Sequence, residues 1–333
     1  MRMGAKRDAD MPLLEVRDLV CTFDGERRGL FAPCSRLQAV SGASFTIARS
    51  EVFGLVGESG CGKSTTAKAI LNIHRPDAGE VRFDGEDLTS ADKARWKQLR
   101  QEIQYVFQDP VGALDPRIRI LDQIVEPLVI HGLGTRSERV IRARNLMRAV
   151  SLGPECEAKY PHELSGGQQQ RVVIARALTL EPTLLICDEP VAALDVSVQA
   201  QVINLLARLR SEFNLTILFI SHDLSLVRHL CDRVAVMYLG RIVEIGASRE
   251  VFANPQHPYT QALISAIPMP DPSRQQSLPL LGDEPPDPLS PPTGCGFHPR
   301  CPHTLALCRS ERPSLRPLPG RQDVACHAVL AET

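Results

Sequence analysis

The chain has 333 residues, of which 43% are hydrophobic and 23% charged, and its 38 basic and 39 acidic side chains leave a net charge of −1. These proportions are typical of globular proteins, so a wholly disordered or fibrous chain is excluded. The nearly balanced charge also argues against a nucleic-acid binder that depends on a strongly basic surface. No apolar run approaches the roughly 18 residues of a membrane span, and the polar first ten residues are not expected to act as a secretory signal. We therefore expect a cytosolic protein, or one that reaches a membrane through a partner.

Strand-like and helix-like segments alternate along most of the chain. Short β-rich runs lie at residues 13–16, 44–47, 52–56, 81–83, 103–107, 184–187, 216–220, 234–238 and 242–245. Helical patterns lie at residues 63–73, 118–131, 137–151, 167–180, 196–213 and 224–230. Alternating strands and helices with buried apolar runs predict an α/β fold around a mainly parallel sheet. The block 119–180, which has no strands, is predicted to be a helical subdomain inserted into that sheet.

Composition divides the chain into a regular body and an unusual tail. Sixteen of the 26 prolines and four of the ten cysteines lie beyond residue 254. We predict a flexible extension at residues 1–10, a main domain at 11–253 and a small cysteine-bearing extension at 254–333.

A glycine-rich segment joins the strand predicted at 52–56 to the helix that follows. Residues 57–64 fit the pattern G-x-x-x-x-G-K-[S/T], and a strand before it with a helix after it is the context of a phosphate-binding loop. Its N–H groups and the helix N-terminus would face the phosphates. Lys63 would reach the β- and γ-phosphates, and Ser64 would offer its hydroxyl to Mg²⁺. The predicted nucleotide-binding residues are Gly57, Glu58, Ser59, Gly60, Cys61, Gly62, Lys63, Ser64 and Thr65.

Two carboxylates follow the apolar run at 184–187. A buried strand there would deliver Asp188 and Glu189 to the carboxyl edge of the sheet, where ligands bind in open α/β folds. Asp188 would hold Mg²⁺ directly or through water, and Glu189 would deprotonate the attacking water. Alone, the pattern fits a strand with a solvated acidic turn equally well. Together with a phosphate-binding loop it favours phosphoryl transfer to water.

A second helix start suited to phosphate begins at Ser165. This serine stands at an N-cap position, and two glycines after it let a phosphate approach the backbone. One nucleotide cannot easily use two such helix starts of one chain, whereas two chains packed head to tail can complete each other's sites. An ordinary capped helix is the alternative. The segment comprises Leu164, Ser165, Gly166, Gly167 and Gln168.

These motifs, in this order and spacing, resemble the ATPase domains of ABC transporters over about residues 13–250. The resemblance implies ATP and Mg²⁺ as ligands and adds an antiparallel β subdomain to the predicted fold. It identifies Gln108 with the glutamine that contacts Mg²⁺ and the water. It places Asp195 at the seam of an ATPase dimer and His222 near the γ-phosphate.

The same resemblance completes the candidate site. Phe23 would stack on adenine with Phe31 as its rival, and a core position is the alternative for either. The implied catalytic residues are Glu189, His222 and Gln108. The implied Mg²⁺ ligands are Ser64, Gln108 and Asp188.

Further residues resemble the ATPases of bacterial dipeptide and oligopeptide importers, so the likeness extends to nearly the whole chain. Val191 and residues 237–240 resemble the F-type ATPase of these importers more than the D-type. Ala192 departs from the family, which more often has serine there, and one hydroxyl is lost at the dimer seam. The matching stretches are 160–163, 190–201, 257–263 and 294–301.

The resemblance implies that ATP hydrolysis powers peptide uptake across the inner membrane, with this chain on the cytoplasmic face. The implied partners are a D-like ATPase in a head-to-tail heterodimer (a homodimer is the alternative), two permeases and, indirectly, a periplasmic or lipid-anchored peptide-binding protein. No nucleic acid is expected. A nickel or other small-solute importer is the main alternative, because the cargo is selected outside this chain. A soluble ABC ATPase is less favoured, since only 55 residues separate Gln108 from Leu164 and leave no room for a long coiled coil.

Four cysteines of the tail are separated by five, six and seventeen residues. Clustered cysteines in a reducing cytosol indicate a metal or redox site before disulfides, and four thiolates suit zinc or an iron–sulfur cluster. The usual C-x₂₋₄-C knuckle of structural zinc is absent. This wider spacing and the family resemblance put a [4Fe–4S] cluster first, Zn²⁺ second, and disulfides or free thiols third. The predicted ligands are Cys295, Cys301, Cys308 and Cys326, with His298, His303 and His327 as spares.

Overall fold

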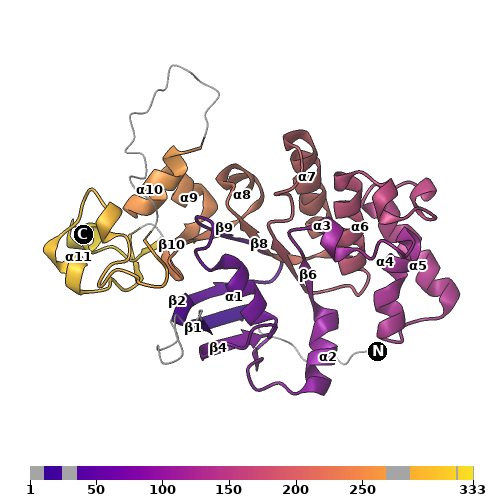
Figure 1. The fold of residues 1–333 in the computed structure, drawn as a ribbon, viewed down its shortest axis with the longest axis horizontal. Helices are drawn as coiled ribbons and strands as arrows, with labels where there is room; N and C mark the ends of the chain where they lie inside the picture. Colours follow the sequence, from indigo (N-terminus) through magenta and orange to yellow (C-terminus); the bar gives the residue numbers. More distant parts are fainter. Residues whose placement is uncertain (1–10, 25–35, 268–285, 320–321, 333) are drawn as a thin grey trace, which may run out of the picture. The chain divides into compact units, whose positions relative to one another are not determined.

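The computed structural model describes residues 11–24, 36–267, 286–319 and 322–332 (Figure 1). The chain forms two compact units. The first comprises Met1–Ala48, Phe53–Ser90 and Ser221–Thr333. The second comprises Arg49–Val52 and Ala91–Ile220.

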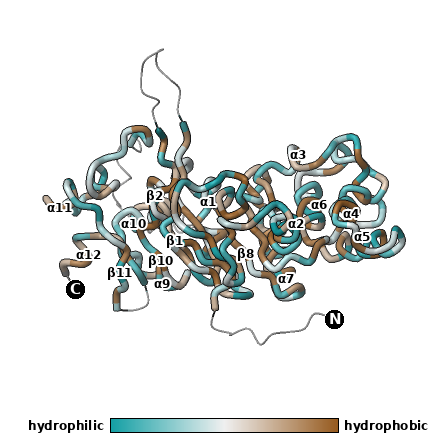
Figure 2. Tube along the Cα trace, turned by 90° about the horizontal axis from the view of Figure 1, so that it is seen from below, coloured by the Kyte–Doolittle hydropathy of each residue, from teal (hydrophilic) through white to brown (hydrophobic). Residues whose placement is uncertain are grey.

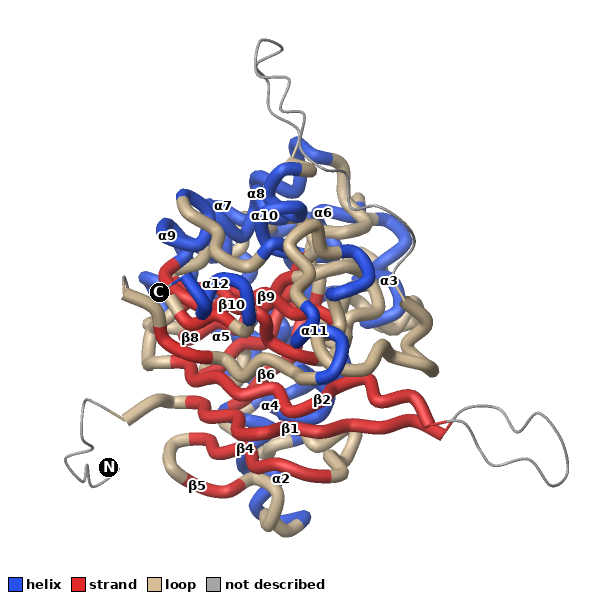
Figure 3. Tube along the Cα trace, turned by 90° about the vertical axis from the view of Figure 1, so that its left-hand side faces the viewer, coloured by secondary structure: helices blue, strands red, loops and turns tan. Residues whose placement is uncertain are grey.

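An antiparallel sheet in the order β2-β1-β4-β5 belongs to the first unit (Figure 3). Its strands are β1 (Leu14–Asp24), β2 (Arg36–Ile47), β4 (Ala78–Phe83) and β5 (Glu86–Asp87). β1 and β2 are much longer than predicted because their pairing continues through several register shifts. At one shift Asp18 adopts a φ of 45° and donates its N–H to Ser44 Oγ. This bond links β1 to β2 at a point where apolar and polar residues no longer alternate.

A second group of strands in the first unit has the order β11-β12-β10-β9-β3. β3 pairs with β9 in parallel, while β9 and β10 form an antiparallel hairpin. Leu239 and Gly240 turn this hairpin with φ values of 44° and 76°, as a tight two-residue turn requires. The strands are β3 (Val52–Val56), β9 (Arg233–Tyr238), β10 (Arg241–Ala247), β11 (Arg316–Pro317) and β12 (Asp323–Val324). The helices of the unit before the tail are α1 (Lys63–Ile70), α8 (Leu224–Leu230) and α9 (Ser248–Ala253), and α10 (Pro258–Ser265) lies at the start of the tail.

The tail contributes only short elements to the first unit. It joins the sheet through β12, which pairs with β10. The tail elements are η3 (His298–Arg300), α11 (Ala306–Ser310) and α12 (His327–Glu332), besides α10 and the two strands already named.

Three parallel strands, in the order β8-β7-β6, organise the second unit. β7 and β8 are buried at every position, as continuous apolar runs predict, and β8 is brown in Figure 2. The strands are β6 (Ile103–Val106), β7 (Leu184–Asp188) and β8 (Thr216–Ser221). The helices are α2 (Lys93–Glu102), α3 (Pro110–Ala113), α4 (Ile120–Ile130), α5 (Arg136–Ala149), α6 (Gly166–Leu178) and α7 (Val196–Phe213), with 3₁₀ turns η1 (Pro154–Cys156) and η2 (Pro161–Glu163).

Helix α2 was not predicted. It is strongly polar and buries only Trp96 and Leu99, so it shows little helical periodicity. Its start is set by Asp92, whose side chain accepts from the Arg95 N–H. No helix in the described part of the chain combines the length and hydrophobicity that a membrane span requires.

Candidate nucleotide-hydrolysis site

Residues 57–64 form the loop between β3 and α1 in the first unit. Gly57 has a φ of 153°, and a Cβ there would lie 2.1 Å from the carbonyl oxygen of Met237. At Gly62, where φ is 109°, a Cβ would lie 2.2 Å from the carbonyl oxygen of Ala39. Only glycine fits at these two positions. Because glycine has no Cβ, the backbone can bend tightly enough there to surround a phosphate group.

The Lys63 side chain folds back into this loop. Its Nζ donates to the carbonyl oxygens of Gly57 (2.8 Å) and Glu58 (2.9 Å), and the residue is 4% exposed. Burial raises the pKa of the neighbouring Cys61 thiol, outweighing the lowering effect of Lys63, so the thiol stays neutral. A buried ammonium group beside loop N–H groups makes this a site for anions.

The remaining loop residues lie at its rim. Ser59 and Gly60 are exposed at the tip, while Ser64 and Thr65 are half-buried in the first turn of α1.

The paired carboxylates lie in the second unit, at the end of β7. Asp188 is its last residue, 4% exposed, and accepts a 2.5 Å hydrogen bond from the Tyr105 hydroxyl. Burial, together with the bond to Asp188, raises the pKa of Tyr105. Tyr105 therefore remains a donor that fixes one carboxylate oxygen. Glu189 follows with a φ of 46°, a left-handed conformation that turns the chain out of the strand.

Gln108, which follows the end of β6 by two residues, reaches the second of these carboxylates. Its Nε2 donates to Glu189 Oε2 over 3.1 Å. β6 and β7 pair in parallel, so their carboxyl ends lie at one edge of the sheet. Within the second unit the structure thus brings together three residues predicted as one site, Gln108, Asp188 and Glu189.

The segment 164–168 begins α6 in the second unit. Ser165 Oγ accepts from the Gln168 N–H (3.3 Å), and Gln168 Oε1 accepts from the Ser165 N–H (3.0 Å), a reciprocal capping box. A Cβ on Gly167 would lie 2.4 Å from Val198 Cγ1, so close packing requires this glycine. Ser165 and Gly166 are exposed, and Leu164 is buried beneath them. The helix start therefore faces outward.

The other predicted residues lie at element ends. Asp195 precedes α7 and is exposed, without a capping bond from its side chain. His222 follows β8 and is also exposed. Phe23 is 38% exposed on β1 and stacks on His74, with ring centroids 4.3 Å apart. Its rival Phe31 lies outside the described residues.

The four tail cysteines are free thiols grouped in the first unit. The Cys295 N–H donates to the Cys308 carbonyl oxygen over 2.8 Å. Burial raises the pKa of Cys295 to about 11, and the three other thiols add to the rise. Within the described ranges, no group of three or more His, Cys, Asp or Glu side chains is arranged to hold a single metal ion.

Two contacts at the site were missed from the sequence. Tyr105 was seen only as a strand residue, yet its hydroxyl holds Asp188. Glu58 was predicted only as a nucleotide-binding residue of the loop, yet its side chain pairs with Arg300 of the tail. The contact between Tyr105 and Asp188 could have been predicted only if the register of the parallel pair β6–β7 had been known. No local pattern signals the second.

Comparisons with known proteins agree with this geometry. The ABC transporter family matches residues 40–192, and the family described as the oligopeptide/dipeptide transporter C-terminal region matches residues 243–308. The di/tripeptide transport ATP-binding protein DppF of Pseudomonas aeruginosa is 47% identical over 95% of this chain and 97% of its own length. The oligopeptide transport ATP-binding protein AppF of Bacillus subtilis is 47% identical with the same coverage, 95% and 97%.

Solved structures show the same fold. The ATP-binding cassette MJ0796, a dimer with ADP and Pi after hydrolysis, matches with a TM-score of 0.63 and 28% identity, over 71% of this chain and 99% of that chain. CbiO1 of Clostridium perfringens, part of an ABC transporter complex, matches with a TM-score of 0.64 and 30% identity, over 73% and 91%.

An α/β fold shared with these cassettes, together with the loop and carboxylates above, defines an ABC-type ATPase, and the predicted ATP hydrolysis is confirmed. Because relatives 47% identical cover nearly its whole length, the chain belongs to the ATP-binding subunits of peptide ABC transporters. The resemblance noted in the sequence is thereby confirmed.

Proposed function

We propose that this chain drives uptake of di- or oligopeptides as the F-like ATPase of an importer at the cytoplasmic face of a bacterial inner membrane. The observation that carries the proposal is the match at residues 243–308, because it extends the likeness to peptide transporters into the tail. The main domain at 11–253 would carry the nucleotide chemistry, and the extension at 254–333 would be specific to this transporter group.

The proposed mechanism assigns each step to residues already described. Lys63 and the loop N–H groups bind the β- and γ-phosphates. Ser64, Gln108 and Asp188 offer hydroxyl, amide and carboxylate oxygens, the hard donors that suit Mg²⁺. The ion, when bound, neutralises charge that develops on the transferring phosphoryl group.

Water activation is assigned to the second unit. Glu189 takes the proton of the attacking water, and Gln108, which donates to Glu189 over 3.1 Å, holds that carboxylate in place. In this scheme Asp195 and the exposed helix start at Ser165 do not contact the nucleotide bound by their own chain. They would contact the nucleotide of a second, D-like ATPase packed head to tail. His222 would contact the γ-phosphate.

Docking to the permeases is assigned to the helical block 119–180. Exposed apolar side chains lie on α4, on the turn after it and on α5. A membrane partner's cytoplasmic helix would cover such side chains. They are Val129, Ile130, Leu133 and Ile141.

Affinity capture from host membranes should recover two permeases and a second ABC ATPase with this chain. Ile130→Asp should lower permease recovery by about tenfold, since it places a charge in an apolar contact. Ile73→Asp is the matched control, because Ile73 lies outside the block and both isoleucines are 63% exposed. Capture of a complex without permeases would favour a soluble ABC ATPase. Vesicles containing the complex that take up nickel and no peptide would show that the cargo is nickel.

The tail cysteines would hold a [4Fe–4S] cluster. Four thiolates are a complete ligand set for such a cluster. The usual closely spaced pair of cysteines that begins a structural zinc site is absent from the sequence. The three other thiols raise the pKa of Cys295, so the four side chains lie near enough to act on one another.

Protein purified without oxygen should be brown and contain about four irons per chain. Cys308→Ala should lose most of the iron, because Cys308 is one of the four proposed ligands. Cys156→Ala, at another buried free cysteine, should keep it. Colourless protein with about one zinc per chain would refute the cluster and leave the four-cysteine site standing.

A further inference from the structure

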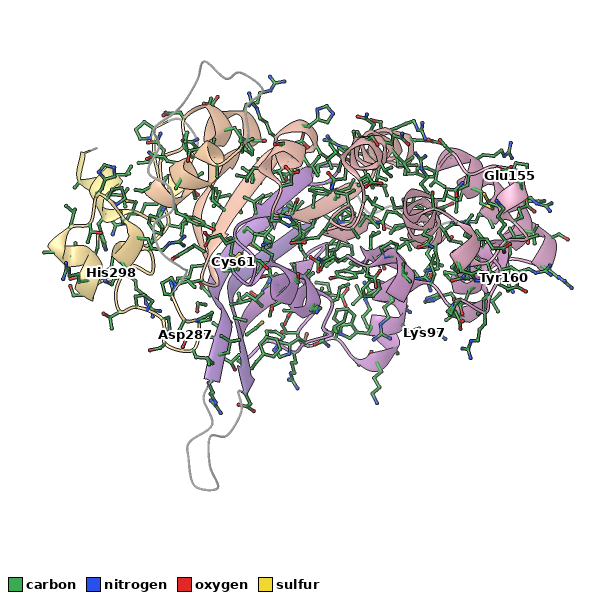
Figure 4. All side chains as sticks on the ribbon, turned by 45° about the horizontal axis from the view of Figure 1, so that its top comes forward. Cys61, Lys97, Glu155, Tyr160, Asp287 and His298 are labelled. Carbon is green, nitrogen blue, oxygen red and sulfur yellow. The ribbon has the colours of Figure 1, made fainter. Side chains whose placement is uncertain are left out.

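The second residue of the phosphate-binding loop is held by the tail. The Glu58 carboxylate accepts from both terminal nitrogens of Arg300, each pair 3.1 Å apart. The Arg300 side chain is 5% exposed and that of Glu58 is 23% exposed. A two-point pair so shielded from water is stronger and more directional than a surface ion pair. Figure 4 marks this part of the first unit by Cys61 of the loop and His298 of the tail.

Aromatic rings fix Arg300 in turn. Its guanidinium carbon lies 6.0 Å from the ring centroids of both Tyr238 and Phe297. The Tyr238 ring also packs on Phe297 at 5.4 Å and on Tyr259 at 4.5 Å. The guanidinium group is therefore confined by Tyr238 of β9 and by two parts of the tail, α10 and the segment around Phe297. It cannot move away from Glu58 without disturbing this cluster.

The backbone of Glu58 is also fixed by hydrogen bonds, one from its N–H and one to its carbonyl oxygen. Its N–H donates to the Tyr259 hydroxyl over 2.9 Å, and its carbonyl oxygen accepts from Lys63 Nζ over 2.9 Å. Lys63 is the cation of the loop, so the residue that Arg300 holds also anchors the ammonium group.

Charge gives the pair a second effect. Glu58 puts a carboxylate in a loop built to bind a triphosphate, and like charges at short range repel each other. The Arg300 guanidinium, paired with Glu58, neutralises this negative charge. Removing Arg300 alone would leave this carboxylate uncompensated beside the phosphates.

We infer that Arg300 is a positioning residue for ATP, so that the tail segment between Cys295 and Cys301 is part of the nucleotide-binding machinery. Arg300 neutralises Glu58 and holds the loop in the shape that binds phosphate. The inference rests on the assignment of residues 57–64 to ATP, which titration of the parent chain tests by itself. It does not depend on the cargo or on the metal of the tail.

The test is the affinity of the full-length chain for Mg-ATP, measured by titration with a fluorescent ATP analogue. Arg300→Ala should weaken binding by about tenfold, because a charged partner is lost. Glu58→Gln alone should weaken binding less than Arg300→Ala does, since a neutral amide still accepts from Arg300. The double variant should regain most of the lost affinity, because no uncompensated carboxylate remains.

A kinetic readout separates positioning from chemistry. In the assembled importer, Arg300→Ala should raise KM for ATP by about tenfold and change kcat by less than about threefold. Arg300→Lys should fall between parent and alanine, since it keeps the charge and loses the two-point geometry. Arg309→Ala, at an exposed arginine of the same tail, should have no effect.

Three outcomes would overturn the inference. The first is Arg300→Ala binding ATP as the parent does. The second is a double variant as weak as Arg300→Ala, because the tail would then act only through general stability. The third is a parent chain that does not bind ATP, which would overturn the loop assignment as well. If circular dichroism shows that Arg300→Ala disturbs the fold, Arg300→Lys takes its place, because it keeps a charge beside Glu58 and loses only the two-point geometry.

Discussion

Replacement of Glu189 by glutamine should leave an importer that binds ATP and scarcely hydrolyses it. Loss of a general base costs roughly 10²–10⁴-fold in rate, while glutamine has nearly the same shape and leaves Asp188 and the phosphate-binding loop untouched. The expected result is a fall of that size in phosphate release by the assembled complex, with ATP affinity within about twofold of the parent. Both quantities should be measured on the same preparation.

Glu212→Gln is the matched control for this substitution. Glu212 is an exposed carboxylate on α7 in the same unit, so its loss should not change turnover. If the Glu189 variant releases phosphate at near the parent rate, the base lies elsewhere. Gln108 would then have to be re-examined too, since its one described side-chain contact is with Glu189.

Elements with continuous apolar runs and clear end signals were predictable from the sequence. β3 at 52–56 and α7 at 196–213 have the bounds that were expected. β3 is wholly buried, so each of its residues is apolar or small and indicates a strand. Asn214 ends α7 in the left-handed conformation that is common after helices. Local chemistry is sufficient in both cases.

Elements that depend on distant partners were not predictable at their full length. The outer halves of β1 and β2 carry mixed polar and apolar residues, and they are strands because they pair with each other through bulges. Helix α2 has two buried side chains, too few to give a helical period.

The same distinction holds for the site. Motif residues such as Gln108 and Glu189 could be named from local patterns, and the structure places them 3.1 Å apart. The groups that hold the motif residues could not be named. Tyr105 is 83 residues from Asp188, and Arg300 is 242 residues from Glu58. Sequence spacing carries no information on such pairs, because the fold alone brings them together.

The bend at Gly62 shows how strictly the fold constrains the phosphate-binding loop. Its φ of 109° lies well outside the range that residues with a Cβ adopt. A Cβ would also lie 2.2 Å from the carbonyl oxygen of Ala39 in β2, which is backbone and cannot rotate away. Alanine at this position must therefore move either β2 or the start of α1, where Lys63 and Ser64 are placed.

Gly62→Ala should abolish measurable ATP binding, a loss of more than about 100-fold, and lower the free energy of unfolding by about 2–4 kcal/mol. The checks are titration with a fluorescent ATP analogue and thermal unfolding of the full chain. Gly42→Ala is the matched control, because Gly42 also has a positive φ (88°) but a Cβ there meets no atom within 4 Å. It should cost only about 1–2 kcal/mol of strain and keep ATP affinity. Retention of ATP binding by Gly62→Ala would mean that this loop does not hold the nucleotide in the bent form described here.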